Sequence, residues 1–392
     1  MRREIEALLL KSFSMSYQVL ARKWRPKSFE TLVGQEHVVR ALTHALQTGR
    51  LHHAYLFTGT RGVGKTTISR ILAKSLNCEQ GITATPCGVC SACTEIDSGR
   101  FVDYVEMDAA SNRGVDDMAA LLEKAAYAPS RGRYKVYMID EVHMLTGHAF
   151  NAMLKTLEEP PEHMKFILAT TDPQKIPVTV LSRCLQFNLK QMPQSHIVEH
   201  LSHILREEGV AFEPGALRHI AKGANGSMRD ALSLLDQAIA HGAGKVEEEG
   251  VRDMLGTVGE DHLFELLDAL RAQDAAALVA VADGMEARSL NFDSALQEFS
   301  VLLHRIALMQ FASQAVVDGF ERERLAPYAE AFDPEYLQLA YQICLHGREE
   351  LALAPDEYTG FTMNLLRLHA FRPEEQGFAV PRSAARPALS RV

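Results

Sequence analysis

The chain has 392 residues and a formal net charge of −9, and 47% of its residues are hydrophobic while 23% are charged. This length favours two or three domains of about 150 residues each, and the composition is ordinary for a soluble globular protein. Residues 1–11 have no convincing signal-peptide core or cleavage site, so we expect a cytoplasmic protein. Because no stretch approaches about 18 uninterrupted apolar residues, we expect no membrane span. The acidic balance excludes a protein whose whole surface binds a polyanion.

The N-terminal region has two parts of different character. Residues 1–14 are expected to be an unstructured extension without function, and Met15 is an alternative start. The segment that follows gathers basic residues around the single tryptophan, Trp24; they are Arg22, Lys23, Arg25 and Lys27. Such a cluster favours either a local DNA contact or a solvated basic face.

A phosphate-binding loop is the most specific motif in the chain. Residues 59–66 read Gly-Thr-Arg-Gly-Val-Gly-Lys-Thr and lie between an apolar stretch at 54–57 and a helical pattern that starts at Ile68. Glycines let successive backbone N–H groups and the N-terminus of the following helix face a phosphate. Lys65 is expected to reach the β- and γ-phosphates, and Thr66 to offer a hydroxyl to Mg²⁺. A chance glycine turn before a helix is the alternative, which this order of elements disfavours.

Four closely spaced cysteines follow the loop. Cys78, Cys87, Cys90 and Cys93 have the spacing C-x8-C-x2-C-x2-C, with Pro86 and Gly88 in the turns. Thiols inside a cell are normally reduced, and four thiolates suit a closed, structural Zn²⁺ site, so we predict a zinc module at 78–93. Free buried cysteines are the alternative. Cys184 and Cys344 are each alone in their regions and are expected to be core residues.

Residues 51–190 alternate short β-branched runs with amphipathic stretches, which predicts a mostly parallel sheet covered by helices. Two helices are expected at 115–126 and 149–157, the second ending at Glu158-Glu159-Pro160-Pro161. The expected strands are His53 to Phe57, Phe101 to Met107, Tyr134 to Ile139, Lys165 to Thr171 and Cys184 to Leu189. The pattern is that of an α/β nucleotide-binding domain.

Polar residues stand at the ends of two of these strands. Asp140 and Glu141 follow the strand at 134–139, where Asp140 is expected to hold Mg²⁺ and Glu141 to polarise the attacking water. Thr171, preferred to Thr170, ends the next strand and is expected to face the γ-phosphate. Adjacent carboxylates and strand threonines are also common structural features. Arg183 lies at the edge of the domain, where a surface salt bridge is the default interpretation.

Strand signals vanish after about residue 194. Three helices are expected at 196–208, 214–224 and 227–240, and longer ones follow at 261–272, 292–312, 334–347 and 358–371. The final residues are rich in Pro, Ala, Arg and Ser and are expected to be disordered. The predicted domains are therefore 15–193, 194–256 and 257–372, with a tail at 373–392.

Several segments together carry a family resemblance. They are the phosphate loop, residues 17–26, residues 33–37, the four-cysteine insertion, Leu157-Glu158-Glu159-Pro160-Pro161 and Ser182-Arg183-Cys184. They resemble the bacterial DNA polymerase III tau/gamma family of clamp-loader AAA+ ATPases, strongly over residues 15–240 and more weakly to about 372. The resemblance implies an AAA+ P-loop domain with a parallel sheet, a small helical lid and an all-α collar that forms oligomers. The chain stops after the collar and so resembles the shorter, gamma-like form; whether this length is natural or a truncation is open.

The resemblance also implies roles for individual residues. Thr171 would be sensor 1, Arg229 would be sensor 2 on the lid, and Arg183 would be an arginine finger that completes a neighbouring subunit's site. Arg113 and Lys155 would follow the DNA backbone. The implied nucleotide-binding residues, of which those from Tyr17 to Pro26 and at 33–34 would border the adenine, are Tyr17, Arg22, Val33, Gly34, Gly59, Gly62, Gly64, Lys65, Thr66 and Thr67.

The function implied is that of a clamp-loader motor with ATP, Mg²⁺ and structural Zn²⁺ as cofactors. ATP would order a ring of this chain, further copies of it and delta- and delta-prime-type subunits, which opens the beta sliding clamp on primed DNA. Hydrolysis would then release both. A ring helicase or branch-migration motor is one alternative, and it would need a DNA-remodelling hairpin or winged helix after the lid. A non-hydrolysing scaffold is the other, and the presence of Lys65, Thr66, Asp140 and Glu141 disfavours it.

Overall fold

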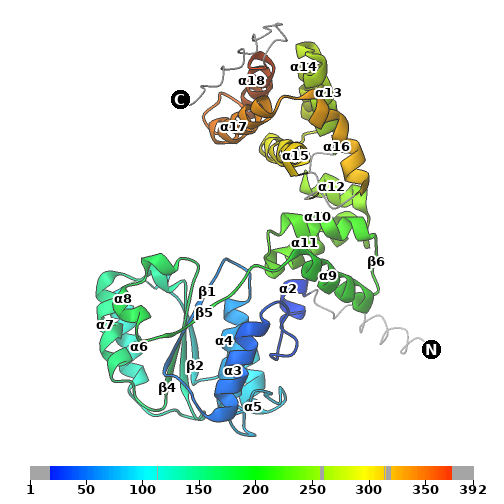
Figure 1. The fold of residues 1–392 in the computed structure, drawn as a ribbon. Coiled ribbons are helices and arrows are strands. Elements are labelled where there is room, and N and C mark those ends of the chain that lie inside the picture. The colour runs from blue at the N-terminus through cyan, green and yellow to red at the C-terminus, as the bar shows by residue number, and fades with distance from the viewer. Residues whose placement is uncertain (1–17, 113, 257–259, 313, 315–318, 373–392) are drawn as a thin grey trace, which may run out of the picture. The chain divides into compact units, whose positions relative to one another are not determined.

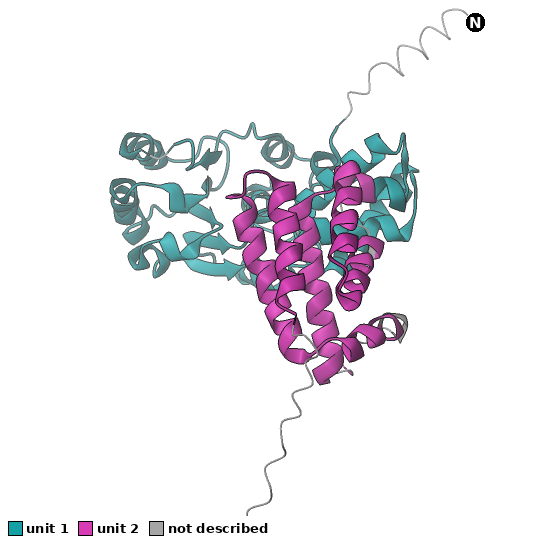
Figure 2. Cartoon of the chain, turned by 90° about the horizontal axis from the view of Figure 1, so that it is seen from above, with its two compact units in different colours: residues 1–251 teal, residues 252–392 magenta. Residues whose placement is uncertain are grey.

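A computed structural model describes residues 18–112, 114–256, 260–312, 314 and 319–372 of the chain. The chain divides into two compact units, residues 1–251 and 252–392 (Figure 1 and Figure 2). The first unit contains a mixed α/β part and a helical part, and the second is helical throughout its described residues. No described helix combines the length and the apolar character that crossing a bilayer requires.

A five-stranded sheet in which all strands run parallel forms the centre of the first unit. Its strand order is β2-β3-β4-β1-β5, so β1 lies between β4 and β5, which are the last two of these strands in chain order. The strands are β1 (Ala54–Thr58), β2 (Tyr104–Asp108), β3 (Lys135–Asp140), β4 (Met164–Thr170) and β5 (Leu185–Asn188). Each overlaps a strand expected from the sequence, which confirms the predicted parallel sheet.

Helices cover both faces of this sheet (Figure 1). Side chains alternate along β1, so that Tyr55 and Phe57 pack into one core while Ala54 and Leu56 pack into the other. The first core is shared with α3 (Glu36–Thr48), α4 (Lys65–Asn77) and α5 (Ser91–Ser98), and the second with α6 (Val115–Ala125), α7 (Gly147–Glu158) and α8 (Val178–Leu181). Every residue of β1 is buried, as expected of a central parallel strand. The strand is therefore a firm support for the loop that follows it.

Asp103, just before β2, fastens the loop that leads into β3. Its carboxylate accepts hydrogen bonds from the backbone N–H groups of Ser130 at 2.9 Å, Arg131 at 2.7 Å and Gly132 at 2.7 Å. Burial by itself raises the pKa of Asp103, but the three N–H donors outweigh it and hold the pKa below its usual value.

Replacing Asp103 with asparagine is expected to lower the free energy of unfolding by about 1–3 kcal/mol, since the amide has one acceptor oxygen for three donors. Urea denaturation at pH 7 measures this. The carboxylate's contribution is present above the pKa of an unfolded aspartate, about 3.9, and is lost as the pH falls through the lower folded pKa, so the difference from wild type shrinks in acid. Asp116→Asn, at an exposed position of α6, is the matched control. Equal unfolding midpoints for all three proteins at pH 7 would contradict the prediction.

The helical part of the first unit, called the lid below, contains α9 (Gln194–Glu208), α10 (Pro214–Gly223) and α11 (Met228–His241). They overlap the helices expected at 196–208, 214–224 and 227–240. The expectation that strands vanish after residue 194 is wrong in detail, because β6 (Ala211–Phe212) and β7 (Lys245–Val246) form a short parallel pair. Two residues are too few to show an alternating pattern in sequence. α12 (Glu248–Leu255) follows β7.

The second unit is a bundle of helices around one apolar core. Its helices are α13 (Glu260–Ala272), α14 (Ala275–Ala287), α15 (Phe292–Ala312), α16 (Gly319–Ala331), α17 (Pro334–Leu351) and α18 (Glu357–Ala370). Four of these overlap helices predicted from the sequence, whereas α14 and α16 were not predicted. Cys344 on α17 is fully buried in this core, and burial raises the pKa of its thiol to about 12, in agreement with a structural role.

Candidate nucleotide and metal sites

The loop at 59–66 joins the end of β1 to the start of α4, which begins at Lys65. Gly62 has a φ of 78°, and a Cβ placed there would lie 1.9 Å from Ser227 Oγ of the lid. Gly59 has a φ of 143°, and its Cβ would lie 2.6 Å from the carbonyl oxygen of Leu189. Both positions therefore require glycine, for backbone conformation and for close approach. The loop is therefore enclosed between the sheet and the lid.

Lys65 is held by the loop itself. Its ammonium donates hydrogen bonds to the carbonyl oxygens of Gly59 at 2.7 Å and Thr60 at 2.9 Å. The side chain is buried, and this burial lowers the pKa of Lys65, while the nearby charges of Glu141 and Asp140 act in the opposite direction. The lysine is thus a desolvated cation at the N-terminus of α4, where a phosphate group is electrostatically favoured.

Thr66 and Asp140 meet at the same edge of the sheet. The Thr66 hydroxyl donates to Asp140 Oδ2 at 3.0 Å, and burial raises the pKa of Asp140 in opposition to this hydrogen bond. A hydroxyl and a carboxylate in contact are oxygen ligands of the kind that Mg²⁺ prefers. The two residues expected to hold the metal are therefore brought together, and their donor set fits it.

Glu141 is fixed by the end of the neighbouring strand. Its Oε2 accepts hydrogen bonds from the Thr171 hydroxyl at 2.9 Å and from the Thr171 backbone N–H at 3.2 Å. Thr170 is fully buried instead, and its hydroxyl lies 2.9 Å from His143 Nδ1. Glu141 has a φ of 47°, a left-handed conformation that costs a non-glycine residue about 1–2 kcal/mol. Such strain persists only where surrounding contacts over-determine it.

The lid reaches the phosphate loop through the first turn of α11. Ser227 caps this helix by accepting a hydrogen bond from the Asp230 N–H at 3.2 Å, and it is the residue that crowds Gly62. Arg229 follows, and its Cβ lies 3.3 Å from where a Gly62 Cβ would stand. The structure thus brings Arg229, the expected sensor 2, to the loop of its own chain.

The segment expected to border the adenine is fastened to both parts of the first unit. The Gln35 side chain, which is fully buried, donates to the Lys190 carbonyl at 2.7 Å and accepts from its N–H at 3.1 Å. This places Val33 and Gly34 beside the connection between β5 and the lid. Arg22 is an exposed residue of α2 (Leu20–Lys23), and Tyr17 lies outside the described residues. Thr67, on the first turn of α4, is half-buried.

Arg183 lies near the amino ends of the strands, whereas the loop lies at their carboxyl ends. It stands just before β5, whose Leu185 pairs with Tyr55 near the start of β1, whereas the loop follows the end of β1. Its guanidinium donates to Glu158 Oε1 at 2.7 Å and to the Thr179 carbonyl at 2.7 Å. It lines an open cavity of about 520 Å³ together with His52, His53, Leu157, Glu158 and Ser182. Arg183 is therefore not brought to the site of its own chain.

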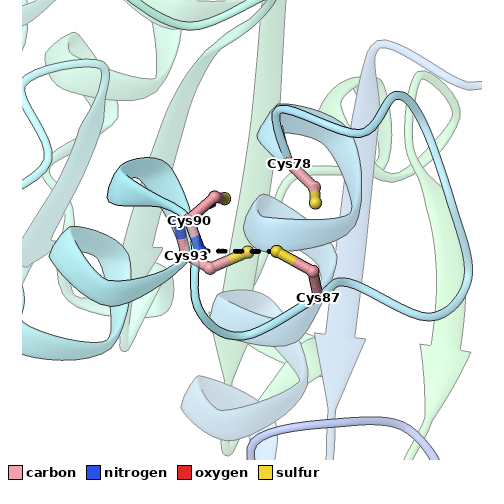
Figure 3. A group of neighbouring side chains, drawn as sticks. All are labelled: Cys78, Cys87, Cys90 and Cys93. Carbon is pink, nitrogen blue, oxygen red and sulfur yellow. Dashed lines mark hydrogen bonds between the residues drawn. The ribbon is translucent and has the colours of Figure 1, made fainter.

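The four clustered cysteines converge between α4 and α5 (Figure 3). Their sulfur atoms all lie within 4.8 Å of one another, which suits four thiolates around a tetrahedral ion with Zn–S bonds of about 2.3 Å. Backbone N–H groups point at two of the sulfurs, from Cys90 to Cys87 at 3.4 Å and from Cys93 to Cys90 at 3.5 Å. Backbone N–H donors lower the pKa of Cys87 to about 6, which favours the thiolate that a metal requires, whereas burial raises the pKa of the Cys93 thiol. The donor set fits zinc and leaves no open position.

Comparisons with known proteins place the chain in a family. Family models match it in succession: "DNA polymerase III, delta subunit" over residues 34–193, "DNA polymerase III clamp loader subunit, ATPase lid domain" over 196–244, and "DNA polymerase III subunits gamma and tau domain III" over 246–377. The DNA polymerase III subunit tau of Escherichia coli K12 is 55% identical over 92% of this chain and 56% of its own length. The DNA polymerase III subunit gamma of Buchnera aphidicola subsp. Baizongia pistaciae is 44% identical over 90% of this chain and 97% of its own length. The chain belongs to the DNA polymerase III tau/gamma family.

Membership of the tau/gamma family agrees with the fold. The parallel sheet, the lid match and the domain III match confirm the predicted class, an AAA+ P-loop domain followed by a helical lid and an all-helical domain. The chain spans about half the length of the curated tau relatives that it matches. Among solved structures, the Thermotoga maritima RuvB Holliday junction branch migration motor has a TM-score of 0.45 at 22% identity and covers 63% of this chain and 79% of its own. The Bacillus subtilis DNA clamp loader delta protein has a TM-score of 0.36 at 15% identity, over 85% and 99%.

Chelation of zinc from this tau/gamma chain is expected to unfold the module at 78–93, because the binding free energy of a structural zinc is itself folding free energy. Elemental analysis should find about one zinc per chain, and Cys93→Ser should lose it and lower the melting temperature. Cys184→Ser is the matched control, since this half-buried cysteine packs beside α7 and α8, away from the cluster. Purified wild-type protein without stoichiometric zinc would overturn the assignment.

Two residues of this tau/gamma chain have surroundings in the structure that the sequence did not indicate. Arg25 was grouped with Trp24, but Lys23 and Trp24 bind Glu208 of the lid at 2.6 and 2.7 Å, while Arg25 is half-buried in another environment. Burial lowers the pKa of Arg25 and the charges of Arg70 and Arg229 lower it further, while the carboxylate of Glu106, which binds Arg70, acts in the opposite direction. The other is His143, to which nothing in the sequence pointed.

Proposed function

We propose that this chain is an ATP-hydrolysing subunit of the bacterial replicative clamp loader. The observation that carries the proposal is the junction of Lys65 and Thr66 with Asp140, Glu141 and Thr171 at one edge of the sheet, in a member of the tau/gamma family. The family of clamp-loader subunits itself implies ATPase activity.

The proposed mechanism begins with Lys65. Its ammonium leaves the carbonyl oxygens of Gly59 and Thr60 and turns to the β- and γ-phosphates of ATP. Thr66 and Asp140 would hold Mg²⁺, which supplies charge neutralisation at the phosphate oxygens when it is bound. Glu141 accepts the proton of the attacking water as general base. Thr171 and Arg229 are proposed to donate to the γ-phosphate, so their contacts differ between the ATP and ADP states.

Arg183 is proposed to act in a neighbouring subunit. Because it stands at the edge of the sheet remote from its own loop, it is available to the nucleotide of an adjacent copy as an arginine finger. Its hydrogen bond to Glu158 would be exchanged for the neighbour's γ-phosphate on assembly. We propose that each nucleotide is thereby shared between two subunits.

The proposed assembly contains further copies of this chain with delta- and delta-prime-type subunits, and it opens the beta sliding clamp on primed DNA. Residues 257–372 are proposed to form the collar that joins the subunits. Exposed Lys155 on α7 is a proposed DNA contact, and Arg113, the other, lies outside the described residues.

The branch-migration alternative is not favoured. The described residues after 252 are helical and match gamma and tau domain III, where that alternative needs a remodelling hairpin or a winged helix. The scaffold alternative is disfavoured, since Lys65, Thr66, Asp140 and Glu141 lie together at the carboxyl ends of the strands, where we propose that they act on ATP.

ATP hydrolysis measured with and without primed DNA, the clamp and the other loader subunits tests the proposal. We expect weak hydrolysis by this chain alone and strong stimulation when all components are present. Stimulation by branched DNA without the clamp would favour the motor alternative instead. No hydrolysis under any condition, with ATP binding intact, would favour the scaffold.

A further inference from the structure

His143 lies next to the carboxylate of Glu141. It lies on the short helical turn η1 (Val142–Met144), and its side chain is largely buried. Its Nδ1 lies 2.9 Å from Thr170 Oγ1 and 3.4 Å from Glu141 Oε2. The ring therefore contacts both the buried end of β4 and the carboxylate that follows β3.

The charge of the Glu141 carboxylate favours one tautomer of the histidine, the one that carries a proton on Nδ1. Thr170 Oγ1 already accepts a hydrogen bond from the Asp172 N–H at 3.0 Å and keeps a free lone pair for another donor. If Nδ1 carried no proton, its lone pair would face the negatively charged oxygen of Glu141. A proton on Nδ1 removes this repulsion, because the N–H then donates to the threonine hydroxyl and presents its positive end near the carboxylate.

The two oxygens of Glu141 consequently differ. Oε2 accepts hydrogen bonds from the Thr171 hydroxyl at 2.9 Å and the Thr171 N–H at 3.2 Å, and His143 Nδ1 lies 3.4 Å from it in an electrostatic contact. Oε1 has no hydrogen-bond partner among the residues that the structure describes, so it is the oxygen free to accept a proton. The side chain is anchored at one oxygen and open at the other.

We infer that His143 is a positioning residue that aims the free oxygen of Glu141 at the attacking water. The inference rests on the proposed function, in which Thr171 turns to the γ-phosphate. When it does so, Oε2 loses the hydroxyl donor, and His143 carries more of the task of holding the carboxylate. His143 itself does not touch the substrate.

Substitutions of His143 distinguish a role in orienting the Glu141 carboxylate from a role in packing. The Nδ2 of asparagine can occupy the place of Nδ1, because both atoms are two bonds beyond Cβ, whereas the amide of glutamine lies one bond further out. His143→Ala and His143→Gln are expected to slow single-turnover hydrolysis about 10- to 100-fold, a part of the 10²–10⁴ attributed to a general base. His143→Asn should recover most of the rate, and ATP affinity should change by less than about twofold in all three. His148→Ala, at an exposed position on α7, is the matched control and should hydrolyse at the wild-type rate.

A double-mutant cycle tests whether His143 acts through Glu141. In a Glu141→Gln background, His143→Ala should cause no further loss, because the carboxylate that it aims is absent. Additive losses, or a His143→Asn protein as slow as His143→Ala at an unchanged melting temperature, would overturn the inference. Full activity of Glu141→Gln itself would instead count against the proposed function.

A second measurement does not depend on hydrolysis. Spectra of the protein labelled with ¹⁵N-histidine report which ring nitrogen carries the proton, and the His143 signal is identified by its loss in His143→Asn. We expect the proton on Nδ1 in the nucleotide-free protein. A proton on Nε2 alone would overturn the inference even if the wild type hydrolyses no ATP.

Discussion

Replacement of Lys65 by alanine is expected to lower ATP hydrolysis about 10²–10³-fold or more, which is the usual effect of removing a donor that stabilises developing charge. Clamp loading onto primed DNA should fall with it. The expected loss is specific to Lys65, because its ammonium is buried at the start of α4. Among the residues that the structure brings to the loop, no other lysine is placed to replace it.

The measurement is steady-state hydrolysis together with clamp loading in the reconstituted assembly. Alanine also leaves the Gly59 and Thr60 carbonyls without their donor, so a melting curve must show that the variant is folded. Lys245→Ala, at an exposed position on β7, is a matched lysine control. Clamp loading by Lys65→Ala at the wild-type rate would refute the assignment of the site.

Replacement of Arg183 by alanine is expected to lower hydrolysis in the assembly about 10³–10⁵-fold, the range reported for arginine fingers. Binding of ATP to the variant's own site should be nearly unchanged, because Arg183 lies at the other edge of the sheet from the loop. Its ion pair with Glu158 is largely exposed to solvent, so its loss should hardly affect folding.

Mixing the two defective proteins distinguishes action within a chain from action between chains. An assembly that contains both Lys65→Ala and Arg183→Ala subunits includes interfaces at which an intact Lys65 meets an intact Arg183. Part of the activity should therefore return on mixing, although each variant alone is inactive. If mixtures stay inactive while they assemble normally, Arg183 does not act in a neighbour.

The sheet and the phosphate loop were predictable because their causes are local. A strand buried on both faces is a short apolar run in sequence, as at 54–57. The glycines of the loop indicate a backbone conformation that other residues cannot adopt. The spacing of the four cysteines likewise predicted a cluster that the structure brings within 4.8 Å. In each case the determining residues are neighbours in sequence.

Features that depend on distant residues were not predictable. The two-residue pair of β6 and β7 is too short to leave a periodic signal. The contact of His143 with Thr170 joins the ends of two adjacent parallel strands, and nothing in either segment indicates it. The environment of Arg25 likewise depends on cations of α4 and α11. Packing, rather than local pattern, decides these positions.

The central strand β1 has a consequence for how nucleotides in an assembly would influence one another. Its five buried residues span about 13 Å, with the phosphate loop at one end and the cavity of Arg183 at the other. Such a strand transmits displacement without bending, because it is packed on both faces. In the proposed ring, a change at one nucleotide would tilt a whole subunit and so withdraw its arginine from the next. Neighbouring nucleotide sites would then be coupled by rigid-body rotation of the subunits, with no deformation inside the sheet.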